Sequence, residues 1–297
     1  MGKVENPNSV GNSVALENEK SGPWQRQFNT EFDFAPCSIS KKFALCTTPR
    51  CGSHFFGHKL HQTGCFGYPL EYFNDGNWRA WGKRAAKSIS TLDYIHSVRT
   101  GPNGVFATKL HHEHLKLFLE KEKDPLSYRF IHLQRRDLLR QAVSFARAQQ
   151  TGAWISDMPE LSKASYDWGM ISQKVDAISL GNANWDSFLT STGARRLTMY
   201  YEDIAADPAA AILKISEFLE IEQVDIGPTK KQFTPRKQSL PANKTEDWSD
   251  RYIQDCQARL ANSKPIAGVH YLPPKFGPKP SAVKISKAFL RNLRMPT

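Results

Sequence analysis

The chain has 297 residues and a mass of 33.6 kDa, with 40% hydrophobic and 23% charged residues, which are ordinary values for a globular protein. Its formal net charge of +11 favours anionic ligands or partners, although a solvated basic face and tail account for part of it. The sequence contains no apolar run of about eighteen residues, so no membrane-spanning segment is predicted.

The cysteines indicate a reducing environment. They number five, form no CxxC pair and have no histidine at a zinc-like spacing, so reduced thiols and no metal site are the simplest interpretation. The N-terminal segment lacks the apolar core of a signal peptide. We therefore expect a cytoplasmic protein.

Three regions are predicted from composition. Residues 1–30 are polar and lack apolar periodicity, which is typical of a flexible arm. Residues 31–264 form the predicted domain, and residues 265–297 form a basic, proline-rich tail. The alternation of Phe28, Phe32 and Phe34 suggests an edge strand that enters the core.

The stretch from residue 41 to residue 74 is the most informative. Residues 43–46 have the composition of a buried strand, residues 47–54 form a small polar turn, and a helix follows until about Thr63. A strand, a glycine turn and a helix together direct unpaired backbone N–H groups and the positive end of the helix dipole at one point. Arg50 adds a forked cation there, so the turn is a predicted anion site.

Strands and helices alternate along the rest of the chain. Further strands are predicted over residues 105–110, 128–133 and 196–201. Helices are predicted over residues 114–119, 138–146, 166–189 with a break near Gly181, 208–219 and 245–262, while residues 74–100 are irregular with a short helix or two. This pattern predicts an α/β fold with a mostly parallel sheet and helices on both faces. Residues 47–54, 109–111, 135–137 and 202–203 then share the carboxyl edge of the sheet, where ligands bind.

Four motifs resemble one enzyme family. The turn lacks the Walker A and Rossmann patterns, but Pro49-Arg50-Cys51-Gly52-Ser53-His54 resembles the sulfotransferase loop that binds 3′-phosphoadenosine 5′-phosphosulfate (PAPS). Residues 64–73 resemble the G-x-P-x-E-[FY]-F signature of the Stf0 branch, the trehalose- and lipopolysaccharide-type sulfotransferases. Residues 147–154 and 199–208 resemble two later segments of that family. The resemblance implies a P-loop-like sulfotransferase fold over about residues 40–260.

The resemblance also implies a donor site for PAPS and its product PAP, without a metal. The residues that it assigns to the nucleotide are Arg50, Cys51, Gly52, Ser53, His54, Arg135, Ser144, Arg236 and Lys237. Residues 51 and 54 depart from the hydroxyl-bearing residues that the family prefers, which bears on the affinity for PAPS.

Glu71 matches the family's basic glutamate and is the predicted general base, with Arg50 stabilising the leaving phosphate. The rival candidates for the base are His54, His58, His61, His111 and His112. We expect its aromatic and proline neighbours to raise its pKa by desolvation. His58 and His61 are interpreted as residues on the helix surface. The predicted acceptor-binding residues are Tyr68, Phe73, Lys109, His111, Gln150 and Trp154.

The predicted function is sulfuryl transfer from PAPS to a hydroxyl of a carbohydrate or glycolipid, with no nucleic-acid partner and with a homodimer left open. One alternative is a nucleotide-dependent phosphotransferase, which would need magnesium and ATP. Another is a non-catalytic anion or nucleic-acid binder that uses the positive charge. A third is a sulfotransferase inactivated by the changes at Cys51 and His54.

Overall fold

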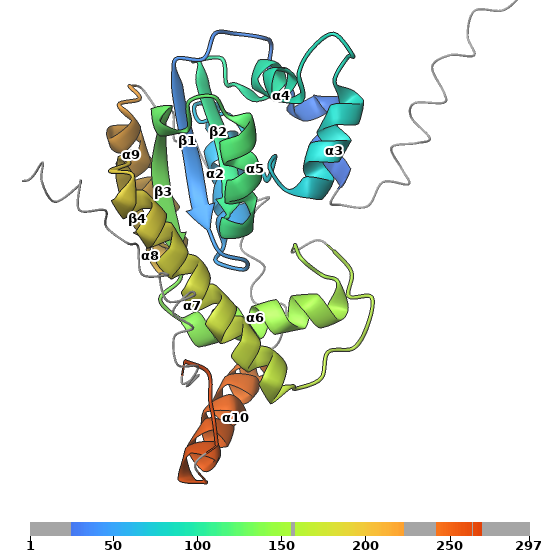
Figure 1. Cartoon of the computed structure of the whole chain (residues 1–297), viewed down its shortest axis with the longest axis vertical. Coiled ribbons are helices and arrows are strands. Elements are labelled where there is room, and N and C mark those ends of the chain that lie inside the picture. The colour runs from blue at the N-terminus through green and yellow to red at the C-terminus, as the bar shows by residue number, and fades with distance from the viewer. Residues whose placement is uncertain (1–24, 156–157, 223–241, 263, 269–297) are drawn as a thin grey trace, which may run out of the picture.

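A computed structural model describes residues 25–155, 158–222, 242–262 and 264–268. Four parallel strands form one sheet in the order β2-β1-β3-β4 (Figure 1). The strands are β1 (Lys41–Thr47), β2 (Val105–His111), β3 (Tyr128–Gln134) and β4 (Arg196–Tyr200). The predicted α/β fold with a parallel sheet is confirmed.

Helices cover both faces of the sheet, because neighbouring strand residues point to opposite sides. Phe43 and Leu45 of β1 pack with α2 (Ser53–Gln62) and α9 (Pro208–Leu219) on one face. Ala44 and Cys46 pack on the other face, with side chains of α3 (Asp75–Arg84), α4 (Thr91–Arg99), α5 (Leu115–Lys121) and α7 (Trp168–Ser191).

A third apolar cluster joins α6 (Leu138–Thr151), α7 and α10 (Ala242–Ala261). Asp137 caps α6 as predicted, because its carboxylate accepts from the backbone N–H of Arg140. The long helix α7 runs from the sheet to α6 and α10, so it connects this cluster to the sheet (Figure 1).

Three predictions of secondary structure are wrong. Helix α7 is continuous, and Gly181 serves close packing instead of a break: a Cβ there would lie 2.8 Å from Cγ2 of Thr48. The phenylalanines near the N-terminus form no edge strand. Phe28 and Phe32 lie in short 3₁₀ helices, η1 (Gln25–Phe28) and η2 (Thr30–Phe32), and they pack against the core with Phe34. The short helix α8 (Tyr201–Ala206) directly after β4 was not predicted.

The remaining elements are the 3₁₀ helices η3 (His112–His114) and η4 (Pro125–Ser127). None of the helices in the described ranges has the length and apolar character needed to cross a membrane.

Candidate active site

The turn between β1 and α2 depends on two residues in the left-handed backbone region. Arg50 has a φ of 66° and Gly52 has a φ of 89°. A Cβ at Gly52 would lie 2.2 Å from Cδ2 of Tyr201, so only glycine allows the turn to pack on this ring. The turn is thereby held against the residue that follows β4, and α2 begins directly after it at Ser53.

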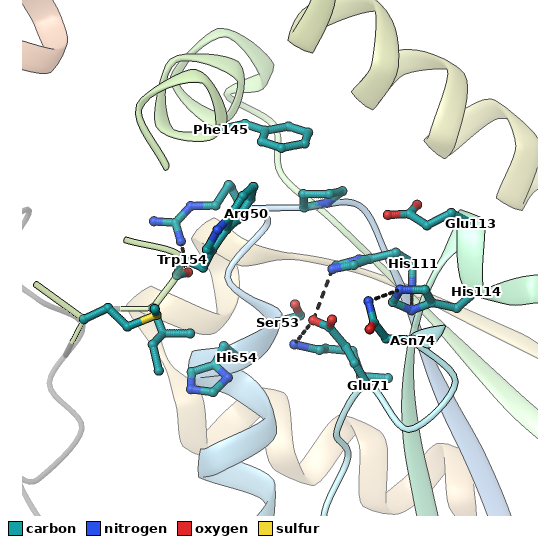
Figure 2. Close-up of a pocket in the computed structure, with 14 residues that line it drawn as sticks. Arg50, Ser53, His54, Glu71, Asn74, His111, Glu113, His114, Phe145 and Trp154 are labelled. Atoms are coloured by element: carbon teal, nitrogen blue, oxygen red, sulfur yellow. Dashed lines mark hydrogen bonds and ion pairs between the residues drawn. The ribbon is translucent and has the colours of Figure 1, made fainter. Parts of the chain in front are cut away.

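Arg50 is held by neutral partners. Its Nε donates to Oγ of Ser144 on α6 at 3.0 Å. Its Nη1 donates to the backbone carbonyl of Trp154 (Figure 2). Within the described ranges, no carboxylate lies at ion-pair distance from Arg50. Burial lowers the pKa of Arg50, and the nearby charge of Arg135 lowers it further. Arg50 is therefore a half-buried cation whose charge has no counter-ion from the described part of the chain.

Arg135 lies beside the same turn. Its guanidinium carbon is 5.1 Å from the centre of the Tyr201 ring, the ring that contacts Gly52, and its Nε is 3.8 Å from Oε1 of Glu202. Ser144 contacts Arg50 and not its own helix backbone. The structure thus gathers the predicted donor residues Arg50, Gly52, Arg135 and Ser144 around the turn.

Glu71 lies across the cavity from Arg50. Its Oε1 is 2.8 Å from Nζ of Lys109 and 3.2 Å from Nε2 of His111 (Figure 2). An isolated parallel bridge pairs Leu70 with Thr108, which puts residue 71 next to the end of β2. His111 is in turn 2.8 Å from the hydroxyl of Thr47, through Nδ1.

The pKa of Glu71 differs from the sequence-based expectation. Burial acts to raise it, as expected, but the charges of Lys109 and His111 outweigh burial and hold the pKa well below its usual value. The expected rise was wrong because the lysine and histidine reach Glu71 from a strand that is distant in the sequence. Glu71 is therefore an ionised carboxylate at neutral pH.

Arg50 and Glu71 line one cavity of about 530 Å³ (Figure 2), whereas Arg135 and Ser144 lie outside its lining. Its polar lining combines cations, carboxylates, imidazoles and small polar groups: Arg50, Ser53, His54, Glu71, Asn74, Lys109, His111, Glu113 and His114. Its apolar lining consists of Pro49, Phe145, Trp154, Ile155 and Met158. The cavity is large enough for a small ligand and offers both charge signs to it.

Some predicted site residues do not line the cavity. Tyr68 and Phe73, predicted to bind the acceptor, are each 1% exposed and belong to the core, because their rings fill the space beside β2. Gln150 instead holds a loop, donating to the carbonyl of Ser165 and accepting from its N–H. The thiol of Cys51 is fully buried. Arg236 and Lys237 lie outside the described residues.

Seven lining residues were not among the predicted site residues: Pro49, Asn74, Glu113, His114, Phe145, Ile155 and Met158. Glu113 and His114 directly follow the end of β2, so extending the strand-end argument by three residues would have included them. Nδ2 of Asn74 lies 3.4 Å from Nε2 of His114. Phe145 lies next to Ser144 on α6 and stacks edge-on against Trp154, a contact that the sequence could not indicate.

Among the residues that the structure describes, no group of three or more histidine, cysteine, aspartate or glutamate side chains is arranged to hold a metal ion.

Comparisons with known proteins indicate a family. The family model "Stf0 sulphotransferase" matches residues 42–255. The chain is 25% identical to the trehalose 2-sulfotransferase of Mycolicibacterium smegmatis, over 72% of this chain and 95% of that protein. It is 21% identical to the trehalose 2-sulfotransferase of Mycobacterium tuberculosis, over 71% of this chain and 94% of that protein.

Among solved structures, a sulfotransferase domain from the curacin biosynthetic pathway is similar, with 14% identity and a TM-score of 0.40 over 65% of this chain and 77% of that one. A sulfotransferase domain from the Synechococcus PCC 7002 olefin synthase has 16% identity and a TM-score of 0.40 over 73% of this chain and 96% of that one.

Proposed function

The chain belongs to the Stf0 sulphotransferase family, and we propose that it transfers a sulfuryl group from PAPS to a hydroxyl of a carbohydrate or glycolipid. One observation carries the proposal. Arg50, half-buried and with only neutral partners among the described residues, faces an ionised carboxylate, Glu71, across one cavity. The names of the two trehalose 2-sulfotransferases support a sugar as the acceptor.

The residues around the turn fit the anionic donor. Arg50 offers a cation that has no counter-ion among the described residues, and the first turn of α2 offers backbone N–H groups at Ser53 and His54. Arg135 and the Ser144 hydroxyl are proposed to hold the 3′-phosphate, with Arg236 and Lys237 in support. At Cys51 only the backbone is proposed to take part, because its thiol is buried.

PAPS would supply the sulfuryl group and leave as PAP. In the transfer, the acceptor oxygen forms a bond to sulfur while the bond from sulfur to the phosphate oxygen breaks. Glu71 takes the hydroxyl proton, and Arg50 stabilises the negative charge that develops on the phosphate oxygen. The lowered pKa makes Glu71 a weak base that is always ionised, so it is ready to accept a proton throughout the neutral range.

The acceptor is proposed to bind between two unlike walls. Trp154 is 41% exposed and stacks against Phe145, which gives an aromatic surface of the kind that packs on the apolar face of a sugar. Opposite it, Asn74 and Glu113 offer polar groups to sugar hydroxyls, and Lys109 and His111 orient Glu71.

A transfer assay tests this function. Radiolabelled PAPS would be incubated with a panel of mono- and disaccharides that includes trehalose, and labelled products would be separated. We expect a sulfated sugar without added magnesium. Phosphorylation of sugars by ATP and magnesium, with no transfer from PAPS, would contradict the proposal.

A further inference from the structure

A chain of hydrogen bonds leads away from the cavity along α2. Nε2 of His54 is 2.9 Å from Nε2 of His58, and Nδ1 of His58 is 3.0 Å from the Tyr68 hydroxyl. His54 lines the cavity, whereas Tyr68 is 1% exposed in the core. The sequence suggested that His58 and His61 lie on the helix surface, but both are half-buried. His58 joins this hydrogen-bond chain, and His61 stacks on the Tyr68 ring at 4.0 Å between ring centres.

The number of available protons fixes the donor-to-acceptor direction of this hydrogen-bond chain. A tyrosine hydroxyl carries a single proton, and within the described residues His58 is the acceptor placed to receive it. If Tyr68 donates to Nδ1 of His58, a neutral His58 carries its proton on Nε2 and donates to Nε2 of His54. His54 then accepts at Nε2 and must carry its own proton on Nδ1.

The reverse direction would leave the buried hydroxyl proton of Tyr68 without an acceptor in the described part of the chain, which is costly. It would also give His54 a lone pair on Nδ1. Nδ1 of His54 has no hydrogen-bond partner of its own among the described residues. The direction of the chain therefore decides whether this nitrogen offers a proton or a lone pair.

Both histidines are neutral at physiological pH, which the proton count requires. Burial lowers the pKa of His58 to about 4, with smaller effects from His61 and Lys109. Burial also holds the pKa of His54 well below its usual value; Lys109, His58 and Arg50 lower it further, and only Glu71 opposes them. Burial raises the pKa of Tyr68, against Arg99 and with Glu31, so its hydroxyl stays protonated.

We propose that His58 and Tyr68 are positioning residues that fix His54 in the tautomer with its proton on Nδ1, so that His54 can donate to a phosphate oxygen of the bound nucleotide. The inference rests on the proposed function, since it assigns the anion to the donor. Phosphate oxygens only accept hydrogen bonds, so a lone pair on Nδ1 would repel them. The hydrogen-bond chain would thus give residue 54 an N–H donor in place of the hydroxyl that the family prefers there.

Nuclear magnetic resonance tests the tautomer directly. Long-range proton–nitrogen correlation spectra of protein with ¹⁵N-labelled histidine distinguish protonated from unprotonated ring nitrogens, and His54→Gln assigns the signals of residue 54. We expect a single Nδ1–H tautomer in the wild type and a mixture of tautomers in Tyr68→Phe. An Nε2–H tautomer in the wild type, or an unchanged spectrum in Tyr68→Phe, would overturn the inference.

Binding gives a second readout with a matched control. Tyr72→Phe removes a neighbouring buried hydroxyl, which donates to the Tyr68 carbonyl at 2.5 Å and lies outside the histidine chain. We expect Tyr68→Phe to weaken PAP binding by roughly 3- to 10-fold, and Tyr72→Phe to leave it unchanged. His58→Leu, which also breaks the chain, should behave as Tyr68→Phe and serves if the latter does not fold.

Adenosine 3′-phosphate separates this inference from the proposed function. It lacks the 5′-phosphate that the turn is proposed to bind, so Tyr68→Phe should not change its affinity. Equal weakening of both nucleotides, or no weakening of PAP in either chain-breaking variant, would contradict the role of the chain. Absence of PAP binding in the wild type would instead contradict the proposed function.

Discussion

Two cations face each other across the cavity, and their surroundings differ. Among the described residues Arg50 has only a hydroxyl and a backbone carbonyl as partners, whereas Lys109 pairs with Glu71 at 2.8 Å. Lys109 is buried and Arg50 is half-buried, so both have lost hydration. An anionic ligand can supply the missing counter-ion to Arg50, whereas Lys109 already has one and instead controls the protonation of Glu71. One side of the cavity therefore binds charge and the other tunes a carboxylate.

The largest effect is expected from removing the carboxylate side. Glu71→Gln keeps the shape of the side chain but cannot accept a proton, so we expect kcat to fall roughly 10²- to 10⁴-fold while PAP binding stays unchanged. Glu120→Gln, which changes an exposed carboxylate on α5 that does not line this cavity, is the control. Full turnover in Glu71→Gln would remove Glu71 as the base.

Lys109→Met tests the tuning of that carboxylate. In the wild type the pKa of Glu71 is depressed, so ionised Glu71 persists as the pH falls below the usual glutamate value, and kcat should fall only in strong acid. Without Lys109, burial dominates and the acid limb of the kcat profile should move up by roughly 1–3 pH units. Lys109→Arg retains the charge and should restore the limb toward its wild-type position. An acid limb that does not move in Lys109→Met would show that Lys109 does not control Glu71.

Gly52→Ala perturbs the turn that carries Arg50. Its Cβ would meet the Tyr201 ring and the backbone would remain at a positive φ, so we expect a loss of stability of about 1–3 kcal/mol and weaker PAP binding. Gly193→Ala is a matched control, because Gly193 has a φ of 63° and open space around it. Chemical denaturation measures both variants. Equal losses in the two would assign the effect to φ alone and not to the contact with Tyr201.

Ser144→Ala should have the smallest effect. It removes one neutral partner of Arg50 and leaves the guanidinium in place, so PAP affinity should fall by a few-fold, about 0.5–1.5 kcal/mol. Ser172→Ala, which removes a buried hydroxyl near Tyr252 and far from Arg50 in the chain, controls for a general loss of stability. Loss of PAP binding as complete as that caused by removing Arg50 itself would mean that Ser144, and not the arginine, is the main phosphate ligand.

The sequence predicted the sheet, the turn and most helices because these depend on local patterns. The continuous buried run of β1 and the Asp137 cap of α6 are examples. The predicted break in α7 at Gly181 was wrong, because this glycine packs closely against Thr48, which is 133 residues away in the sequence.

The site was predictable only in part for the same reason. Motif resemblance located Arg50 and Glu71, but the depressed pKa of Glu71 arises from Lys109, which the Leu70–Thr108 bridge brings alongside. The same motif suggested Tyr68 as an acceptor ligand, although its ring is buried and its hydroxyl faces His58.

Arg50 and Arg135 are together proposed to bind the donor nucleotide. Calorimetric titration of PAP into the wild type, Arg50→Ala, Arg135→Ala and the exposed control Arg136→Ala tests this role, with ATP and magnesium as the competing ligand. We predict that the wild type and Arg136→Ala bind PAP and that each of the other two variants loses roughly tenfold or more in affinity. Undiminished PAP binding in Arg50→Ala, or a preference for ATP and magnesium in the wild type, would contradict it.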